Sequence, residues 1–354
     1  MKCWISFLLF LGISLDLWGF DVRVLIGQTN GVIFVPGKGL VDVAEVKKDT
    51  CFGNGQSLIY YQRRPYRGRI CIVKDSGKTL VVNVLDIEEY VKGVLYNEIS
   101  HYWPIEAIKA QAVVSRTYAL YRVLSSGRKE AFDLKDDQSS QVYRGYNSEH
   151  FRTNKAVDET KGEVLVCANT HRVFPAFYHA CCGGKTELPQ NVWMGNDFKC
   201  DFEVVEDPFC SICPYISWKY EISTFDFVSC LRELGVKGRE VKYISVSDIT
   251  DSGRAKSILL ITDKGQYLLS AQKVRMMLGS SRLRSTLFQV RMIGNKLIFW
   301  GHGWGHGVGM CQWGAYGMAL KGYSYKEILK FYFPNADISD LSAVIEPCEL
   351  VEHK

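Results

Sequence analysis

The stretch DIEEYVKGVLYNEISHYWPIEAIKAQAVVSRTYALYRVLSSG, residues 86–127, predicts two consecutive helices and decides the fold. Asp86, followed by Glu89 three positions later, resembles a capping box at the start of the first helix. Pro104 suits the first position of the second helix, and Gly127 is typical of its end. Apolar residues recur at helical spacing in both segments, so each helix is expected to bury one face.

Strand-like segments are predicted on both sides of these helices. Residues 21–83 alternate short apolar runs with turns, and residues 219–300 combine such runs with a helix end. We therefore expect an α+β fold, with the helices packed on a mixed, mainly antiparallel sheet. The expected regions are a signal segment (1–20), a β-rich N-terminal region (21–83), a core (84–218 and 301–340) and a small α/β insertion (219–300).

The composition of the 354-residue chain is that of a globular protein. Hydrophobic residues make up 47% and charged residues 23%, which excludes a wholly disordered chain. The net charge of +5 is mild, and no block of Lys and Arg marks a nucleic-acid surface. We expect no nucleic-acid partner.

The first residues resemble a secretory signal. Met1 and Lys2 precede an uncharged run from Trp4 to Leu15, which is short for a membrane-spanning helix. We expect an exported protein of the periplasm or cell envelope. An uncleaved anchor, which would be the only membrane contact, and a buried first helix are the alternatives.

Glu98 is the most informative residue of the first helix. It follows Val91, Val94 and Leu95 at spacings that share one helical face, so an apolar stripe ends in a carboxylate. Burial among apolar neighbours would raise the pKa of this carboxyl, as a general acid requires. Alternatively, the helix ends by Asn97 and Glu98 faces water.

A second carboxylate of comparable standing is not found near Glu98 in the sequence. Glu106 is the other candidate for the catalytic acid, but it lies in the first turn of the next helix, where a negative charge suits the helix dipole and needs no further role. Glycoside hydrolases usually use two carboxyl groups. A single carboxyl can still cleave a glycosidic bond if a hydroxyl of the sugar itself attacks.

Glycine occupies every second position in GHGWGHGVG, residues 301–309. If this ribbon is extended, His302, Trp304, His306 and Val308 leave one face, and the other face is bare backbone. An aromatic ring between two imidazoles suits a sugar ring. If the strand continues, the Gln312 side chain would leave the same face as that of His306. The alternative is a structural ribbon packed on another element.

Cysteines gather between residues 179 and 213. His179, Cys182, Cys210 and Cys213 are zinc-like in ligand type, and Cys210 and Cys213 form a Cys-x-x-Cys pair. Disulfides, for example between Cys182 and Cys210, and free thiols remain open. Vicinal Cys181 and Cys182 point opposite ways in a strand, so at most one is expected to be a ligand.

Three stretches together resemble the SpoIID/LytB family. They are EYVKGVLYNEISHYWPIEAIKAQAVVSRTYAL at 89–120, FYHACCGGKTE at 177–187 and GHGWGHGVGMCQWGAYGMA at 301–319. The resemblance implies a lytic transglycosylase that acts on peptidoglycan glycan strands stripped of their stem peptides by an amidase. Such an enzyme cleaves between MurNAc and GlcNAc and leaves 1,6-anhydroMurNAc ends.

The resemblance also implies roles for individual residues. The catalytic glutamate of the family falls on Glu98. Substrate-binding positions fall on Gln111, Arg116, Thr117 and Tyr118, with Arg116 as a clamp for the lactyl carboxylate of muramic acid. The zinc of some family members, taken as structural, adds weight to His179 and Cys182 as ligands.

The sequence departs from the family pattern in two places. Ile99-Ser100 replaces the usual Met-Pro after the glutamate, and Cys311 replaces a Ser.

The alternative function is a non-catalytic peptidoglycan-binding protein that stimulates an N-acetylmuramoyl-L-alanine amidase. A Cys-dependent peptidase using Cys181 or Cys182 is a third reading, but neither thiol has an evident activating neighbour.

Overall fold

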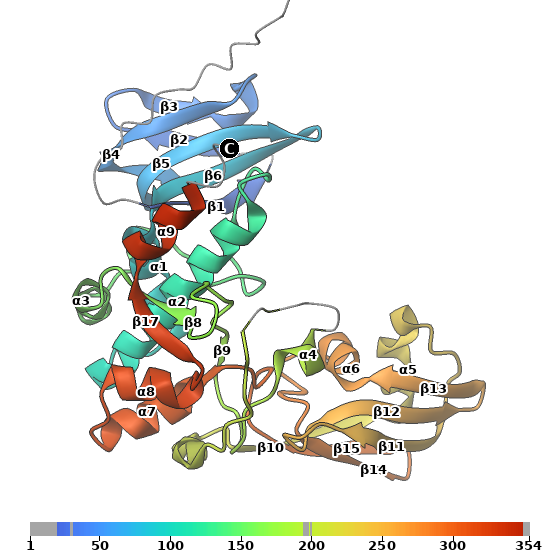
Figure 1. Ribbon diagram of the computed structural model, residues 1–354. Coiled ribbons are helices and arrows are strands. Elements are labelled where there is room, and N and C mark those ends of the chain that lie inside the picture. Colours follow the sequence, from blue (N-terminus) through green and yellow to red (C-terminus); the bar gives the residue numbers. More distant parts are fainter. Residues whose placement is uncertain (1–19, 29–30, 194–197, 199, 350–354) are drawn as a thin grey trace, which may run out of the picture.

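The computed structural model describes residues 20–349 apart from 29–30, 194–197 and 199. The predicted signal segment therefore lies, except for Phe20, outside the described residues. Among the helices that are described, none is long and apolar enough to cross a membrane. The predicted α+β fold is confirmed: a strand-rich region, a helical centre and an insertion follow one another across the molecule (Figure 1).

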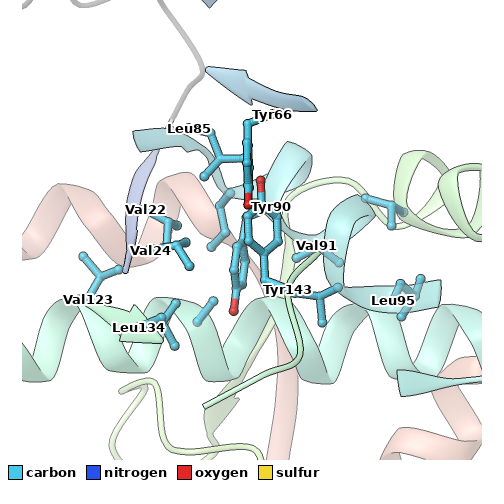
Figure 2. Close-up of a cluster of buried hydrophobic side chains, with 14 of the residues drawn as sticks. Val22, Val24, Tyr66, Leu85, Tyr90, Val91, Leu95, Val123, Leu134 and Tyr143 are labelled. Atoms are coloured by element: carbon cyan, nitrogen blue, oxygen red, sulfur yellow. The ribbon is translucent and has the colours of Figure 1, made fainter. Parts of the chain in front are cut away.

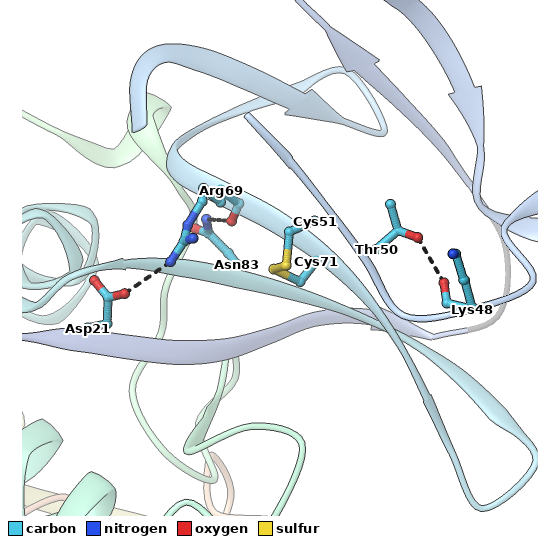
Figure 3. The surroundings of a disulfide bond; sticks show 7 residues. All are labelled: Asp21, Lys48, Thr50, Cys51, Arg69, Cys71 and Asn83. Atoms are coloured by element: carbon cyan, nitrogen blue, oxygen red, sulfur yellow. Dashed lines mark hydrogen bonds and ion pairs between the residues drawn. A yellow bond between two sulfur atoms is a disulfide. The ribbon is translucent and has the colours of Figure 1, made fainter. Parts of the chain in front are cut away.

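The N-terminal region forms a seven-stranded sheet with the order β3-β2-β4-β5-β6-β1-β7. Its strands are β1 (Asp21–Gln28), β2 (Val32–Val35), β3 (Gly39–Asp42), β4 (Thr50–Tyr61), β5 (Arg64–Asp75), β6 (Lys78–Asp86) and β7 (Leu134–Lys135). Neighbouring strands are antiparallel except for the parallel pair β1 and β7. Cys51 of β4 lies opposite Cys71 of β5, and the two form a disulfide (Figure 3).

Two helices follow the sheet directly: α1 (Ile87–Glu98) and α2 (Ile105–Ser126). The Asp86 side chain caps α1 by accepting a hydrogen bond from the Glu88 N–H. Pro104 precedes α2, one position earlier than predicted, and Gly127 ends that helix in the left-handed region with φ 54°. Buried side chains of both helices and the sheet form one core, which Figure 2 shows around Tyr90 and Tyr143.

The remaining elements of the core come from distant parts of the chain. They are α3 (Phe151–Glu159), β8 (Glu163–Cys167), β9 (Tyr178–His179), α4 (Pro189–Val192), β16 (Met310–Cys311), α7 (Gln312–Leu320), α8 (Tyr325–Tyr332), β17 (Ala336–Asp340) and α9 (Leu341–Glu349), with the 3-10 turns η2 (Tyr146–Ser148) and η3 (Pro208–Ile212). Two further 3-10 turns lie outside the core: η1 (Val43–Glu45) follows β3 in the N-terminal region, and η4 (Arg232–Leu234) lies in the insertion. Strand β9 pairs in parallel with β16, and β8 pairs antiparallel with β17. The β9–β16 pair brings the cysteine-rich segment beside the end of the glycine ribbon.

The insertion consists of two three-stranded sheets and two helices at one end of the molecule (Figure 1). Its elements are β10 (Ser217–Ser223), α5 (Thr224–Cys230), β11 (Val241–Ile249), β12 (Ala255–Thr262), β13 (Gly265–Ser270), α6 (Ala271–Leu278), β14 (Phe288–Ile293) and β15 (Lys296–His302). Every strand pair between residues 217 and 302 is antiparallel. The insertion thus mixes helices and strands as predicted, but without the parallel crossover of a βαβ unit.

Candidate functional site

Glu98 is the last residue of α1, and its side chain is half-buried. Val94 and Leu95 on the same face are fully buried, so the apolar stripe does end in this carboxylate. The Val142 N–H donates a hydrogen bond of 2.8 Å to Glu98 Oε1. Burial raises the pKa of the Glu98 carboxyl, while the hydrogen bonds from Val142 and the Tyr178 hydroxyl oppose the rise. A carboxyl of this kind holds its proton to higher pH than an ordinary glutamate.

Glutamine side chains fix the surroundings of Glu98. Gln312 Nε2 donates to the Glu98 carbonyl oxygen at 2.8 Å and to Gln111 Oε1 at 3.2 Å. Gln141 Nε2 donates to the Tyr178 hydroxyl at 3.3 Å. The structure therefore brings the predicted residues Gln111 and Gln312 to Glu98. Tyr178 and Gln141 have no predicted role, although Tyr178 lies in one of the stretches that carry the family resemblance.

Aromatic side chains lie next to this network. Phe177, which precedes Tyr178, stacks on Trp193 with ring centroids 4.3 Å apart and lies 6.1 Å from Tyr118. His306 lies 5.0 Å from Trp193. These rings are half-buried. A second half-buried group consists of Trp313 and Tyr316, which follow Gln312 in the sequence, and Trp103, whose ring contacts both. Aromatic rings of this kind are suited to stacking against sugars.

Burial keeps the His306 imidazole neutral. Its pKa is lowered to about 3, first by burial and then by the positive charges of Arg275 and Arg254. The Val308 N–H donates to His306 Nδ1 at 3.0 Å. His306 can therefore offer a neutral hydrogen-bonding group beside Phe177, but near neutral pH it is not the charged imidazolium that a general acid would need to be.

Arg116 and Thr117 are in the core and not at the site. The Arg116 side chain is fully buried, and its Nε and Nη2 atoms bind both carboxylate oxygens of Glu88 at 2.9 and 2.6 Å. Thr117 Oγ1 donates to the Val113 carbonyl and accepts from the Leu165 N–H. The expectation that these two residues bind substrate is therefore corrected, because both have internal partners that hold α2 to the rest of the core.

The glycine ribbon is not one flat strand. Strand β15 ends at His302, and Gly303, Gly305, Gly307 and Gly309 all have positive φ values between 71° and 117°. A Cβ atom at Gly303, Gly305 or Gly309 would collide with residues 177–183, so the bare side of the ribbon is packed against that segment.

The ribbon's side chains consequently go to different places. His306 lies near Phe177, beside the Glu98 network. Trp304 lies against Tyr215, with ring centroids 5.1 Å apart. His302 is exposed at the end of β15. The expected line of an aromatic ring between two imidazoles is therefore corrected, and only His306 lies beside this network.

A buried group of Cys182, Asp207, Cys210 and Cys311 offers ligand atoms that all lie within 4.8 Å of one another. The Cys182 Sγ lies 3.4 Å from Cys210 Sγ and 3.2 Å from Asp207 Oδ2. Backbone N–H groups of Cys182 and Gly314 donate to Cys311 Sγ. Burial, together with the Cys182 thiol, raises the pKa of Asp207 to about 7. Three sulfurs and one carboxylate fit a tetrahedral zinc site, and such an ion would hold all four groups deprotonated.

Two of the predicted metal ligands, Cys182 and Cys210, belong to this group, and two do not. Cys213 contacts the Cys181 thiol, which lowers the pKa of Cys213. His179 Nδ1 lies 3.1 Å from the Val308 carbonyl, beside the group. The group instead takes Asp207, which caps the 3-10 turn carrying Cys210, and Cys311, which comes from the far end of the ribbon. Cys182 and Cys210 are free thiols.

The sequence is similar to known proteins over most of its length. A family model described as stage II sporulation protein, SpoIID, matches residues 75–167. An uncharacterized protein of Brachyspira hyodysenteriae is 36% identical over 92% of this chain and 87% of its own length. The stage II sporulation protein D of Bacillus subtilis is 29% identical over 75% of this chain and 77% of its own. The chain belongs to the SpoIID family.

The SpoIID match includes α1, α2 and the Gln141–Val142 segment that contacts Glu98. The amidase enhancer of Bacillus subtilis is also similar, 30% identical over 70% of this chain, which spans only 40% of that protein. A second family model, described as a domain of unknown function, matches residues 215–309. That range covers the insertion and the glycine ribbon, so this SpoIID protein carries an insertion that is recognised as a domain in its own right.

Proposed function

We propose that this protein is a lytic transglycosylase that cleaves peptide-free peptidoglycan strands between MurNAc and GlcNAc. The observation that carries the proposal is the Glu98 carboxyl, half-buried with a raised pKa among the hydrogen-bonding and aromatic side chains described above. The groups that act on the pKa of Glu98 include no second carboxylate within the described residues. One carboxyl suits a reaction in which the substrate supplies its own nucleophile.

The chemistry balances with Glu98 alone. Its protonated carboxyl donates a proton to the glycosidic oxygen as the bond from C1 of MurNAc breaks. The C6 hydroxyl of the same sugar attacks C1, and the Glu98 carboxylate accepts the hydroxyl proton. The products are a free GlcNAc hydroxyl and a 1,6-anhydroMurNAc end, and Glu98 is protonated again. Gln312 and Val142 hold the carbonyl and the carboxylate of Glu98 in place.

Product analysis tests this proposal. Peptide-free glycan strands would be incubated with the protein in isotopically labelled water, and the ends analysed by mass spectrometry. The proposal requires 1,6-anhydroMurNAc ends that contain no solvent oxygen. Reducing ends that carry solvent oxygen would show a hydrolase and reject the transglycosylase reaction.

A non-catalytic role is the second candidate, and the similarity to a protein named amidase enhancer favours it. In that case the protein binds glycan strands and stimulates an N-acetylmuramoyl-L-alanine amidase without cleaving them. Purified protein that binds peptide-free glycan but releases no product, while raising the amidase rate, would select this role.

We also propose that the protein works outside the cytoplasm, in the cell envelope, where peptidoglycan lies. The signal-like first residues support this localisation. So does the disulfide between Cys51 and Cys71, because disulfides persist in oxidising compartments. Detection of the mature chain in the envelope fraction, with a shortened N-terminus, would test it.

Zinc is the proposed occupant of the Cys182, Asp207, Cys210 and Cys311 group, with a structural role. Filling such a site to a thousand times its Kd would stabilise the fold by about 4 kcal/mol. We expect bound zinc in the purified protein, and a lower Tm after chelation. Cys210→Ser should lose the metal, whereas Cys230→Ser, outside the group, should keep it. Full stability in a zinc-free preparation would contradict the assignment.

A further inference from the structure

The outer face of the sheet β10–β15–β14 presents aromatic residues to solvent. Burial alternates along β15: Leu297 and Phe299 are fully buried, whereas Trp300 and His302 point outward. Trp300 is 37% exposed. The Trp side chain carries a large, rigid apolar surface with a polar N–H, so an outward ring of this kind is a candidate for ligand contact.

Polar residues flank these rings in register. Lys219 of β10 and Gln289 of β14 lie on either side of Trp300, and Ser217 lies opposite His302. All three flanking side chains are exposed. The face therefore combines a flat ring with hydrogen-bond donors and acceptors, which is how proteins hold the apolar faces and hydroxyls of sugars.

Trp304 and Tyr215 lie just beyond the paired ends of β15 and β10, where His302 is opposite Ser217. The Gly303 N–H donates to the Ile216 carbonyl, which keeps the two segments in register. The Arg284 guanidinium lies 4.9 Å from the Trp304 ring centroid and 5.3 Å from that of Tyr215. Tyr215 is 40% exposed. Two of the side chains that the ribbon diverts from Glu98, His302 and Trp304, thus belong to this second surface.

We propose that Tyr215, Arg284, Trp300, His302 and Trp304, here called the β15 surface, bind a second stretch of the glycan strand that is cleaved at Glu98. This inference rests on the proposed function and extends it to the insertion. The occupant is a peptide-free glycan strand because its charge complements the surface. Each muramic acid of such a strand carries a free lactyl carboxylate. Neither Arg284 nor Arg291 of β14 has an ion-pair partner within the described part of the chain.

Continuity with the site is the second argument. The chain runs from Trp300 through Trp304 to His306, which lies near Phe177 and so beside Tyr178 and Glu98. A long strand held at both places gains affinity from each, whereas a short one reaches a single place. The β15 surface therefore sets a preference for long, peptide-free strands.

Binding is measured in the Glu98→Gln background, so that the strand stays intact. Trp300→Ala is expected to weaken binding of long peptide-free strands about three- to tenfold. Tyr243→Ala is the matched control, since Tyr243 is an exposed ring on the insertion's other sheet, and it should bind like its parent. Arg284→Gln should weaken binding of these strands but not of chitin oligosaccharides, which lack the carboxylate. Unchanged affinity in Trp300→Ala would overturn the proposal.

Kinetics separate a binding surface from a structural role. With Glu98 intact, Trp300→Ala should raise KM for long strands, leave kcat unchanged and leave the turnover of tetrasaccharides unchanged. Equal loss of turnover on short and long strands would show a structural defect and reject the β15 surface. Loss of amidase stimulation with unchanged glycan affinity would show that a protein occupies this face and would also reject it.

Failure of the proposed function is recognised separately. If the native protein releases no anhydro ends but Trp300→Ala still weakens glycan binding, the transglycosylase reaction is wrong and the β15 surface stands. If anhydro ends form and Trp300→Ala behaves as its parent in both assays, the reaction stands and the β15 surface is wrong.

Discussion

At the residue scale, the surroundings of Glu98 set this carboxyl apart from an exposed glutamate. The apolar spacing before it predicts the half-buried position correctly, because residues on one helical face share their surroundings. The hydrogen bond from Val142 could not be predicted, since Val142 lies 44 residues away and reaches Glu98 only through the tertiary fold. For the same reason Arg116 was misassigned: its partner Glu88 is 28 residues away, on the neighbouring helix.

The pH dependence expected for the proposed reaction follows from the raised pKa of Glu98. The acid form donates the proton, so activity should fall as the pH rises through this raised pKa. The Tyr178 hydroxyl lowers the pKa of Glu98, so Tyr178→Phe should move the falling limb to higher pH. His306, with a pKa of about 3, does not titrate there. Tyr102→Phe, an exposed hydroxyl, serves as control. A limb that stays in place, or moves to lower pH, contradicts the assignment.

Arg116 should behave as a structural residue. Arg116→Ala leaves the buried Glu88 carboxylate without its partner, and this should lower the free energy of unfolding by about 3–5 kcal/mol. Urea denaturation measures the change, with Arg122→Ala on the exposed side of the same helix as the reference. A variant of unchanged stability with a raised KM would restore Arg116 to substrate binding.

At the element scale, the two central helices were predicted with almost the right ends, because their caps and apolar periodicity are local signals. The conformation of the glycine ribbon was not predicted correctly. Alternation of Gly predicts an extended strand, but glycine also permits positive φ, and Gly303 to Gly309 use that freedom to pack against residues 177–183. Sequence alone does not distinguish these two uses of glycine.

The close packing of the ribbon can be tested at Gly309. A Cβ there would collide with the Phe177 carbonyl, and φ is 71°. Gly309→Ala should cost more than about 2 kcal/mol of folding stability, since both strain and overlap act. Gly322 has a similar φ of 88° with no atom near its Cβ position, so Gly322→Ala measures the strain alone, at about 1 kcal/mol. Equal losses would mean that the ribbon is loosely packed.

At the scale of the whole molecule, the contacts between distant segments could not be predicted. The insertion's antiparallel pairing and the Cys51–Cys71 disulfide join residues that the sequence does not mark as partners. Spacing indicated Cys182 and Cys210 as metal ligands, and the fold adds Asp207 and Cys311, which spacing did not indicate. The Glu98 network and the β15 surface both depend on the ribbon that joins core and insertion.

The central claim is that one carboxyl, Glu98, serves as acid and then as base. The most direct measurement is the rate at which anhydroMurNAc ends are released from peptide-free glycan by Glu98→Gln, compared with the unaltered protein. Glu106→Gln is the matched control, because Glu106 pairs with Lys109 at the start of α2. We expect a loss of about a hundredfold or more for Glu98→Gln with glycan binding retained, and near-normal rates for Glu106→Gln. Near-normal release by Glu98→Gln would contradict it.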